Sequence, residues 1–244
     1  MESQVYLKKR PRKLKVAIIG FPGVGMIGLA SVRMMVRQLK AEKIGEIISP
    51  YYPHQAVMLK SGLLRPTRVT LYRYKDILFV VGDYQPNESV GQYELSYKIV
   101  ETLKKLKIEY IITVGGYVVR DSAEANKAYI VANNKQMLQK WKEEWKGKGE
   151  VGKARGIIVG LAGLIPVVAK YYKIPAMVLL MTTPGGVYDL LALQEAITIL
   201  RDVFGLPVNL QDIEKKINET KEVMERIKLE VEDKEKESTS PYIR

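Results

Sequence analysis

A glycine-rich loop at residues 20–28 is the strongest candidate for a chemical site in this sequence. Its glycines are Gly20, Gly23, Gly25 and Gly28. Their spacing resembles the fingerprint of dinucleotide-binding folds, in which glycine permits a tight turn and a helix N-terminus attracts an anion. However, Phe21 and Pro22 are inserted into the loop, and the next expected strand does not end on the acid that holds ribose hydroxyls. We therefore favour a structural turn that lets a helix and a strand pack closely.

Two acidic residues and one histidine are the other candidates for chemistry. Asp83 follows an apolar run and could act as a general base, but it has no matched acid, so a turn role is favoured. Asp189 lies after a glycine turn and before a helical pattern. Ligands bind at such places in open sheets, but an N-cap role is the better interpretation. His54 has no motif partner and is expected to be an ordinary surface or hydrogen-bonded histidine.

The composition excludes several classes of chemistry. The 244 residues include no cysteine and a single histidine. Disulfides, thiolate nucleophiles, iron–sulfur clusters and cysteine zinc sites are therefore excluded, and any histidine-based triad or zinc site would depend on His54. Any enzyme would have to work with carboxylates, lysines, hydroxyls and backbone dipoles. Taken with the ordered motifs described below, the composition favours a protein that is not an enzyme, with no catalytic residues, no metal and no cofactor.

The charge is large but unevenly distributed. The chain has 39 Lys and Arg against 27 Asp and Glu, a net charge of +12. Residues 1–211 carry +14, of which residues 1–15 supply +5, whereas residues 212–237 carry −3. This surplus could attract nucleic acid, but no nucleic-acid-binding motif accompanies it. No apolar run approaches the roughly 20 residues of a membrane span, and the N-terminus lacks a signal-peptide pattern. We therefore expect a cytoplasmic protein.

Hydrophobic periodicity predicts the elements that must position these residues. Short apolar runs rich in β-branched residues predict strands at residues 15–20, 44–49, 69–74, 77–82, 110–114, 129–132, 156–159 and 176–181. Helical spacing predicts helices at residues 26–40, 93–106, 137–145, 161–172 and 190–204. Buried strands that alternate with helices indicate an α/β fold, with a mostly parallel sheet covered by helices on both faces. The expected segments are a basic arm (1–13), the α/β domain (14–210), a charged helix (211–237) and a flexible tail (238–244).

The charged helix carries a narrow apolar seam. Its apolar positions are Ile213, Ile217, Met224, Ile227 and Val231, with Thr220 in the gap. Steps of three and four residues make a heptad pattern, which is typical of helices that pack between subunits. Packing on the helix's own domain is the simpler alternative.

Five motifs in order resemble the archaeal proteasome-assembly-chaperone family, the relatives of the second eukaryotic proteasome assembly chaperone. The inserted Phe-Pro that opposes dinucleotide binding is part of that family's pattern. The resemblance covers residues 14–210. Its motifs are GFPGVGMIG at 20–28, GDYQP at 82–86 followed by YEL at 93–95, TVGGY at 113–117, GLAGLIP at 160–166, and TPG at 183–185 followed by Asp189 and Ala192.

The resemblance implies a sheet similar to that of nucleoside phosphorylases, without their catalytic residues. It also implies a homo-oligomer in which the glycine loop is structural. A ring is one arrangement of that oligomer, and a paralogue is one further partner. The implied partners are proteasome α-subunits or the α-ring. Docking in that family uses a C-terminal hydrophobic-Tyr-any tripeptide, whereas this chain ends Tyr242, Ile243, Arg244, so its tyrosine stands one place early.

The sequence therefore favours a non-enzymatic, oligomeric chaperone or adaptor of the proteasome that docks through its tail. One alternative is a protein that binds a nucleoside or phosphate, or an enzyme, using Asp83, Asp189 and the glycine loop. The second alternative is a non-specific nucleic-acid binder. An ordinary ragged C-terminus remains the simpler interpretation of the tail.

Overall fold

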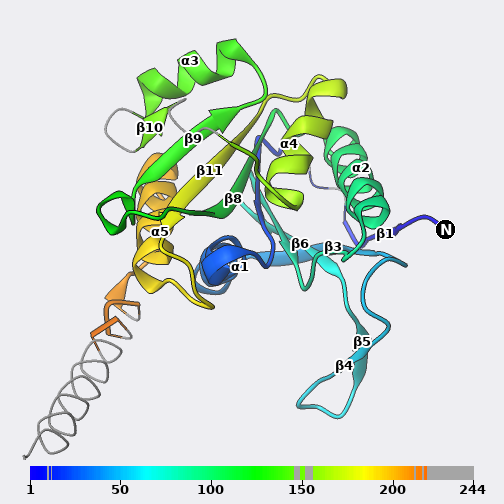
Figure 1. Ribbon diagram of the computed structural model, residues 1–244. Helices are drawn as coiled ribbons and strands as arrows, with labels where there is room; N and C mark the ends of the chain where they lie inside the picture. The colour runs from blue at the N-terminus through cyan, green and yellow to red at the C-terminus, as the bar shows by residue number, and fades with distance from the viewer. Residues whose placement is uncertain are drawn as a thin grey trace, which may run out of the picture. The chain divides into compact units, whose positions relative to one another are not determined.

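The computed structural model describes residues 1–9, 11, 13–145, 149–151, 156–211, 213–215 and 217–218 (Figure 1). The chain divides into two units, residues 1–208 and residues 209–244. The first unit contains every helix and strand discussed below.

A nine-stranded sheet runs through the first unit. Its spatial order is β1-β3-β6-β7-β2-β8-β11-β9-β10. In chain order these strands are β1 (Gln4–Leu7), β2 (Val16–Gly20), β3 (Glu42–Ile48), β6 (Val69–Tyr74), β7 (Ile77–Gly82), β8 (Tyr110–Val118), β9 (Ala128–Ala132), β10 (Glu150–Val151) and β11 (Ala176–Thr183). A separate two-stranded hairpin is formed by β4 (Ala56–Met58) and β5 (Leu64–Pro66).

The sheet is mixed, so the expectation of a mostly parallel sheet is wrong. Strands β7, β2, β8 and β11 form a parallel centre. On one side, β6, β3 and β1 continue the sheet in antiparallel pairs. On the other side, β9 pairs antiparallel with β11 and parallel with β10. Strands β6 and β7 were both expected, and they pair antiparallel as a hairpin through Lys75. Strand β1 was not expected, because it comes from the segment interpreted as a basic arm, and it adds a further antiparallel pair.

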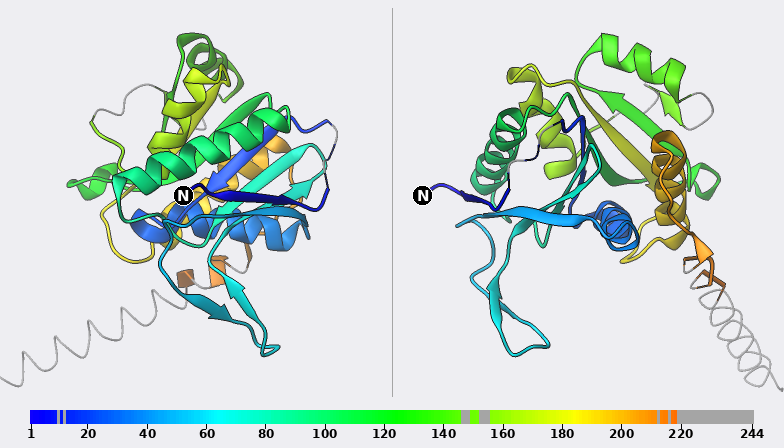
Figure 2. Two further views of the ribbon diagram at one scale, coloured as in Figure 1. Left: turned by 90° about the vertical axis from the view of Figure 1, so that its right-hand side faces the viewer. Right: turned by 180° about the vertical axis from the view of Figure 1, so that it is seen from behind.

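Helices cover both faces of the sheet, as expected. Helices α1 (Ile27–Gln38) and α5 (Leu190–Phe204) pack on each other and on the central strands. Helices α2 (Ser89–Lys105) and α4 (Leu161–Tyr171) also pack on each other, and α4 contacts strands β8 and β11. Helix α3 (Lys135–Glu144) lies along β9 and β10 (Figure 2).

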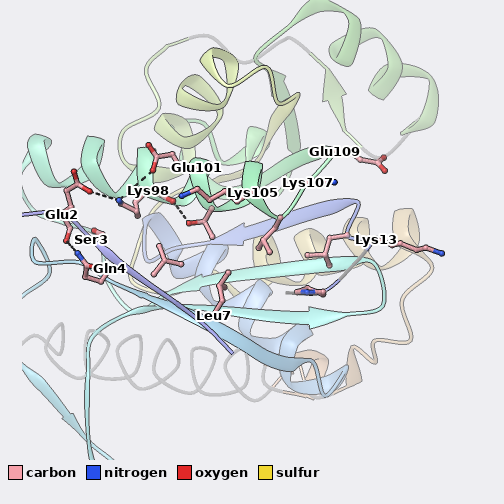
Figure 3. A pocket seen from close by; sticks show the side chains of 15 residues that line it. Glu2, Ser3, Gln4, Leu7, Lys13, Lys98, Glu101, Lys105, Lys107 and Glu109 are labelled. Atoms are coloured by element: carbon pink, nitrogen blue, oxygen red, sulfur yellow. Dashed lines mark hydrogen bonds and ion pairs between the residues drawn. The ribbon is translucent and has the colours of Figure 1, made fainter. Parts of the chain in front are cut away.

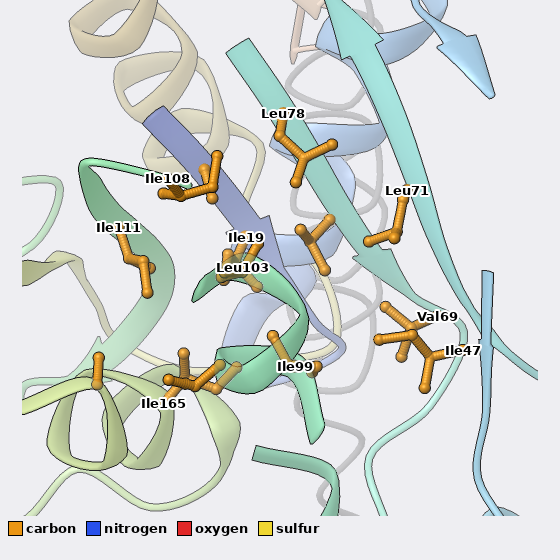
Figure 4. Packing of buried hydrophobic residues seen from close by; sticks show 14 of the residues in the cluster. Ile19, Ile47, Val69, Leu71, Leu78, Ile99, Leu103, Ile108, Ile111 and Ile165 are labelled. Carbon is orange, nitrogen blue, oxygen red and sulfur yellow. The ribbon is translucent and has the colours of Figure 1, made fainter. Parts of the chain in front are cut away.

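The main core lies between the sheet and the α2–α4 pair. Ile19 from β2 and Ile111 from β8 meet Ile99 and Leu103 from α2 and Ile165 from α4 (Figure 4). All five side chains are almost completely buried. Burial of one such side chain stabilises the fold by about 1.5–3 kcal/mol, so this cluster holds the parallel centre of the sheet in place.

The N-terminal segment contributes an edge strand. β1 pairs with β3, with Gln4 opposite Ile48. The backbone N–H of Ser3 donates a hydrogen bond to the Glu94 side chain at 2.6 Å. Residues 4–7 of the expected basic arm are therefore part of the sheet.

In the second unit the structure describes only the first seam positions. Ile213 and Ile217 are both buried. Thr220, Met224, Ile227, Val231 and the terminal residues Tyr242, Ile243 and Arg244 lie outside the described residues. Within the described part of the chain, no helix is both long and apolar enough to span a membrane.

Candidate interaction site at the carboxyl edge of the sheet

The motif segments converge on one edge of the sheet. Strands β7, β2, β8 and β11 are parallel neighbours, so their carboxyl ends lie together. Three of the segments begin at these ends, and the N-terminus of α4 joins them because Thr113 Oγ1 donates a hydrogen bond to the carbonyl of Ala162 at 2.6 Å. In open α/β sheets this edge is where ligands bind. We call it the carboxyl edge.

Gly20 and Gly28 allow β2, α1 and β8 to approach each other at backbone distance. A Cβ on Gly20 would lie 2.1 Å from the carbonyl oxygen of Gly28. A Cβ on Gly28 would lie 2.2 Å from the carbonyl oxygen of Val114. Real Cβ atoms do not approach backbone so closely, so any side chain here would force the helix off the sheet.

The other two glycines of the loop differ from each other. Gly25 has a φ of 63° and lies in η1 (Val24–Met26), the short helical turn before α1. A Cβ at Gly25 would lie 3.2 Å from the Cβ of Asp189. Gly23 has an extended backbone, and the nearest atom to a Cβ there would be Gln85 Nε2 at 3.9 Å. Close packing therefore requires glycine at Gly20 and Gly28, and the left-handed φ favours it at Gly25, whereas neither constraint applies at Gly23.

The inserted Phe21 interlocks the glycine loop with the next motif. A Cβ on Gly82, the last residue of β7, would lie 2.0 Å from the Phe21 ring. The Phe21 side chain is buried. The insertion that argued against a dinucleotide site therefore places an aromatic ring over the end of β7.

Gln85 links the loop to helix α4. Its Nε2 donates a hydrogen bond to the carbonyl of Pro22, and its Oε1 accepts one from the backbone N–H of Leu161 at 2.8 Å. The N–H of Leu161 lies in the first turn of α4 and has no partner within the helix. Both ends of the Gln85 amide are therefore used inside the fold.

Asp83 is an anchor and not a free base. It accepts hydrogen bonds from Arg33 of α1 at 2.9 Å, from Arg65 of β5, and from the backbone N–H of Arg68 at 3.2 Å. Its negative charge lies close to the buried Tyr52. Burial, and then the Asp83 charge, raise the pKa of Tyr52 far above its ordinary value, so that hydroxyl stays protonated.

Asp189 caps helix α5, as favoured from the sequence. Its carboxylate accepts a hydrogen bond from the backbone N–H of Ala192 at 3.0 Å. Its own backbone N–H donates to the carbonyl of Gly25 at 3.1 Å. Asp189 therefore joins the glycine loop to the last helix of the domain.

His54 is exposed, in the segment that leads into the β4–β5 hairpin. The structure does not bring it together with Asp83 or Asp189 through any hydrogen bond among the described residues. Within the same residues, no group of three His, Asp or Glu side chains is arranged to hold a metal ion.

A groove of about 270 Å³ opens at the carboxyl edge. Its described lining comes from the glycine loop, the end of β8, the start of α4 and the segment before α4, and none of these residues is charged. The lining residues are Phe21, Pro22, Gly23, Val24, Gly28, Gln85, Val114, Gly115, Gly116, Tyr117, Val118, Ile157, Ile158, Val159 and Ala162. We call this the apolar groove.

The rim of the apolar groove carries exposed aliphatic side chains. Ile157 is 86% exposed and Val159 is 85% exposed. Val118 and Val24 also reach solvent. The sequence pattern at residues 156–159 predicted a buried strand, but the structure has no strand there. These β-branched residues line a surface and not a core.

A larger hollow, of about 1240 Å³, lies between β1 and helix α2 (Figure 3). Its lining mixes basic and acidic residues. Lys98 forms an ion pair with Glu2 at 3.0 Å and approaches Glu101 at 4.0 Å. Because lysines and glutamates both line it, this hollow offers no site of a single charge sign for a ligand.

The chain belongs to the PAC2 family, whose model matches residues 17–228. The resemblance inferred from the five motifs is thereby confirmed.

Solved structures agree with this family. PbaB of Pyrococcus furiosus, described as an archaeal proteasome activator, superposes with a TM-score of 0.84 at 24% identity, over 93% of this chain and 99% of its own. PbaA of the same organism, described as an archaeal homolog of proteasome-assembly chaperone, gives a TM-score of 0.79 at 21% identity, over 98% and 96% of the two chains. An uncharacterised protein of Methanocaldococcus jannaschii is 26% identical over 89% of this chain and 84% of its own. At these identities the solved structures establish the fold.

Proposed function

We propose that this protein is a non-enzymatic, homo-oligomeric chaperone or adaptor, which assists assembly of the proteasome core particle or docks on its α-ring. Membership of the PAC2 family is the observation that carries the proposal. It is supported by the likeness, over more than nine-tenths of the chain, to structures described as a proteasome activator and a proteasome-assembly chaperone homolog. The action is cytoplasmic, where α-subunits are made and assembled. We also propose that the sheet is similar to that of the nucleoside phosphorylases.

The chemistry of the carboxyl edge supports a protein partner over a small polar ligand. Small-molecule sites usually enclose about 300–1,000 Å³ and aim a few polar groups inward. The apolar groove is smaller, and the amide of Gln85 is already used within the fold. Asp83 and Asp189, the carboxylates that could contact the hydroxyl or amino groups of a nucleoside, are held by arginines and by a helix N-terminus. Aliphatic side chains of another protein suit such a groove better than a phosphate.

The C-terminal residues Tyr242, Ile243 and Arg244 are the proposed docking element. A terminal carboxylate next to an aromatic and an aliphatic side chain can enter a basic pocket between α-subunits. One such peptide binds weakly. Several of them on one homo-oligomer would gain affinity through effective concentration.

The proposed homo-oligomer assembles in part through the heptad seam of the charged helix. Ile213 and Ile217 are buried, so the contact between subunits is assigned to Met224, Ile227 and Val231. An Ile227→Asp substitution is expected to lower the mass measured by light scattering while the circular dichroism of the domain is retained. An unchanged mass would remove the seam from the proposal.

The docking claim is tested by co-purification of the full chain with proteasome α-subunits. The full chain is expected to retain them, and a chain truncated after Ser240 is expected to lose them. Within the tail, Tyr242→Ala should weaken retention, whereas the matched Ser240→Ala should not. If the full chain fails to bind at any ionic strength, the partner claim is wrong.

Two cheap measurements separate the alternatives. A nucleoside or phosphate binder would be stabilised by about 2.7 kcal/mol at 100-fold excess of ligand over its Kd, and a thermal-shift panel would detect this. A nucleic-acid binder would lose affinity steeply with added salt. The proposed chaperone is expected to show neither effect.

A further inference from the structure

The β4–β5 hairpin has a defined conformation, and the proposed function assigns it no role. The backbone N–H of Leu59 donates to the carbonyl of Leu63 at 2.9 Å, and the N–H of Gly62 donates to the carbonyl of Leu59 at 2.9 Å. Gly62 has a φ of 79°. This is the three-residue hairpin loop in which a left-handed glycine follows a tight turn. The tip is therefore a specified structure and not an irregular loop.

Large aliphatic side chains gather at this tip in contact with solvent. Met58 is 79% exposed, Leu64 is 70% exposed and Leu63 is 65% exposed. Met58 and Leu64 are directly paired across the two strands, so they lie on the same face of the hairpin. Leu59 adds a fourth exposed side chain. Contiguous exposed aliphatic groups of this kind mark interaction surfaces.

The hairpin is anchored at its base and free at its tip. Arg65 of β5 pairs with Asp83, which also holds Arg33 of α1 and the backbone of Arg68. Beyond this anchor the hairpin projects away from the sheet and its helices (Figures 1 and 2). An isolated two-stranded hairpin is only marginally stable in water. Its own domain therefore fixes its direction but leaves its aliphatic face uncovered.

The apolar groove is the complementary surface on the same chain. It is concave, uncharged along its described lining and rimmed by Val118, Ile157 and Val159. Both features lie at the carboxyl edge, because β3 ends there before the hairpin and β6 begins there after it. Every copy therefore carries both an exposed aliphatic hairpin and an apolar groove.

We propose that the hairpin of one copy inserts the paired side chains of Met58 and Leu64 into the apolar groove of a second copy. Each copy gives one hairpin and receives one, so the contacts close as a reciprocal pair or as a ring. The inference rests on the homo-oligomer in the proposed function and identifies its contact.

The extent of these surfaces agrees with a stable interface. The hairpin segment at residues 54–66 spans 13 positions, and the apolar groove is lined by 15 residues. One side of a standard protein interface comprises about 20–30 residues. In a reciprocal pair, each side of the interface combines the hairpin and the groove of one copy, which together reach that number. In a ring, each side would be only one of the two surfaces and would fall short of it, so the extent favours the reciprocal pair.

The first experiment measures the solution mass of the full chain by light scattering over a range of concentrations. Leu64→Asp places a charge on the hairpin, and Val159→Asp places one at the rim of the apolar groove. Each is expected to raise the concentration of half-dissociation about 10-fold or more. Ser61→Asp puts the same charge on the same exposed hairpin, outside the aliphatic face, and is expected to leave the mass unchanged. Circular dichroism checks that each variant is folded.

The second experiment uses the absence of cysteine from the chain. A Met58→Cys chain is mixed with a Val159→Cys chain under mild oxidation, and a disulfide-linked pair is expected only in the mixture. Tyr6→Cys, on the exposed face of β1, replaces Val159→Cys as the control and should give no pair. The cross-link is necessarily intermolecular because each chain carries one thiol.

The outcomes separate this inference from the proposed function. Dissociation by both aspartate variants together with the specific cross-link supports the hairpin contact. An oligomer that resists both variants and gives no cross-link overturns the hairpin contact and leaves the proposed function standing with another interface. A wild-type chain that is monomeric at all concentrations overturns both the contact and the homo-oligomer.

Discussion

The glycine loop and the β4–β5 hairpin lie at the same edge of the sheet, and each depends on glycine, but in opposite ways. At Gly28 a Cβ would meet the backbone of β8 at 2.2 Å, because α1 packs directly against that strand there. At Gly62 a Cβ would meet nothing within 4 Å, and only the φ of 79° requires glycine. The loop is therefore constrained by the domain, whereas the hairpin is constrained by its own turn. A glycine in the sequence does not by itself reveal which constraint applies.

The largest expected effect comes from Gly28→Ala. The new methyl would overlap the carbonyl oxygen of Val114, so α1 must move off β8 or the chain must fail to fold. A loss of about 3 kcal/mol or more in the free energy of unfolding is expected. The matched control is Gly23→Ala, which has open space and an extended backbone and should change stability by less than about 0.5 kcal/mol. Urea unfolding of both variants tests the difference. Equal losses would show that the loop is not packed as described.

The sequence predicts the packed parts of the carboxyl edge better than its exposed parts. The strands at 69–74 and 77–82 and the helix at 190–204 were predicted with the bounds that the structure has. Strand β7 is a continuous apolar run buried at every position, and helix α5 buries one periodic face, so both give strong sequence signals. The glycine loop was predicted as a structural turn, and the geometry at Gly20, Gly25 and Gly28 supports that role.

The hairpin and the rim of the groove were not predictable in this way. Met58, Leu63 and Leu64 have the hydrophobicity of a core but lie in solvent, and Ile157 and Val159 were interpreted as a buried strand for the same reason. Local pattern reports that a segment is apolar; it does not report which surface will cover it. β1 was missed because its side chains are half-buried along a sheet edge and show no long apolar run.

A second effect tests whether Gln85 holds the packed loop together. Gln85→Ala removes the donor to Pro22 and the acceptor for the N–H of Leu161, which leaves two polar groups near the apolar groove without partners. A loss of about 2 kcal/mol is expected. Gln92→Ala removes one hydrogen bond, to the carbonyl of Pro86 at 3.0 Å, and should cost about half as much. Thermal unfolding ranks the two, and the reverse order would contradict the bridging role.

A smaller effect is expected at the junction of the loop with helix α5. Asp189→Ala removes the acceptor for the backbone N–H of Ala192 and should cost about 1 kcal/mol. Asp189→Asn keeps a capping oxygen and should retain most of the stability. If Asn is as costly as Ala, the negative charge and not the cap is what the fold requires.

The smallest effect on the domain, and the sharpest contrast with Gly28, is expected for Gly62→Ala. Alanine meets no atom at this position but must adopt a left-handed backbone, which costs about 1 kcal/mol. Because the tip packs on nothing in its own domain, this cost should appear as local opening of the hairpin, with the global free energy of unfolding unchanged. Amide hydrogen exchange at Leu59, whose N–H donates to Leu63, should accelerate about 5-fold in the dissociated chain. In the oligomer the same amide should become protected in the wild type if the hairpin is inserted in a second copy. A fall in global stability equal to the local cost would mean that the hairpin unfolds together with the domain, and the distinction between the two glycines would then be lost.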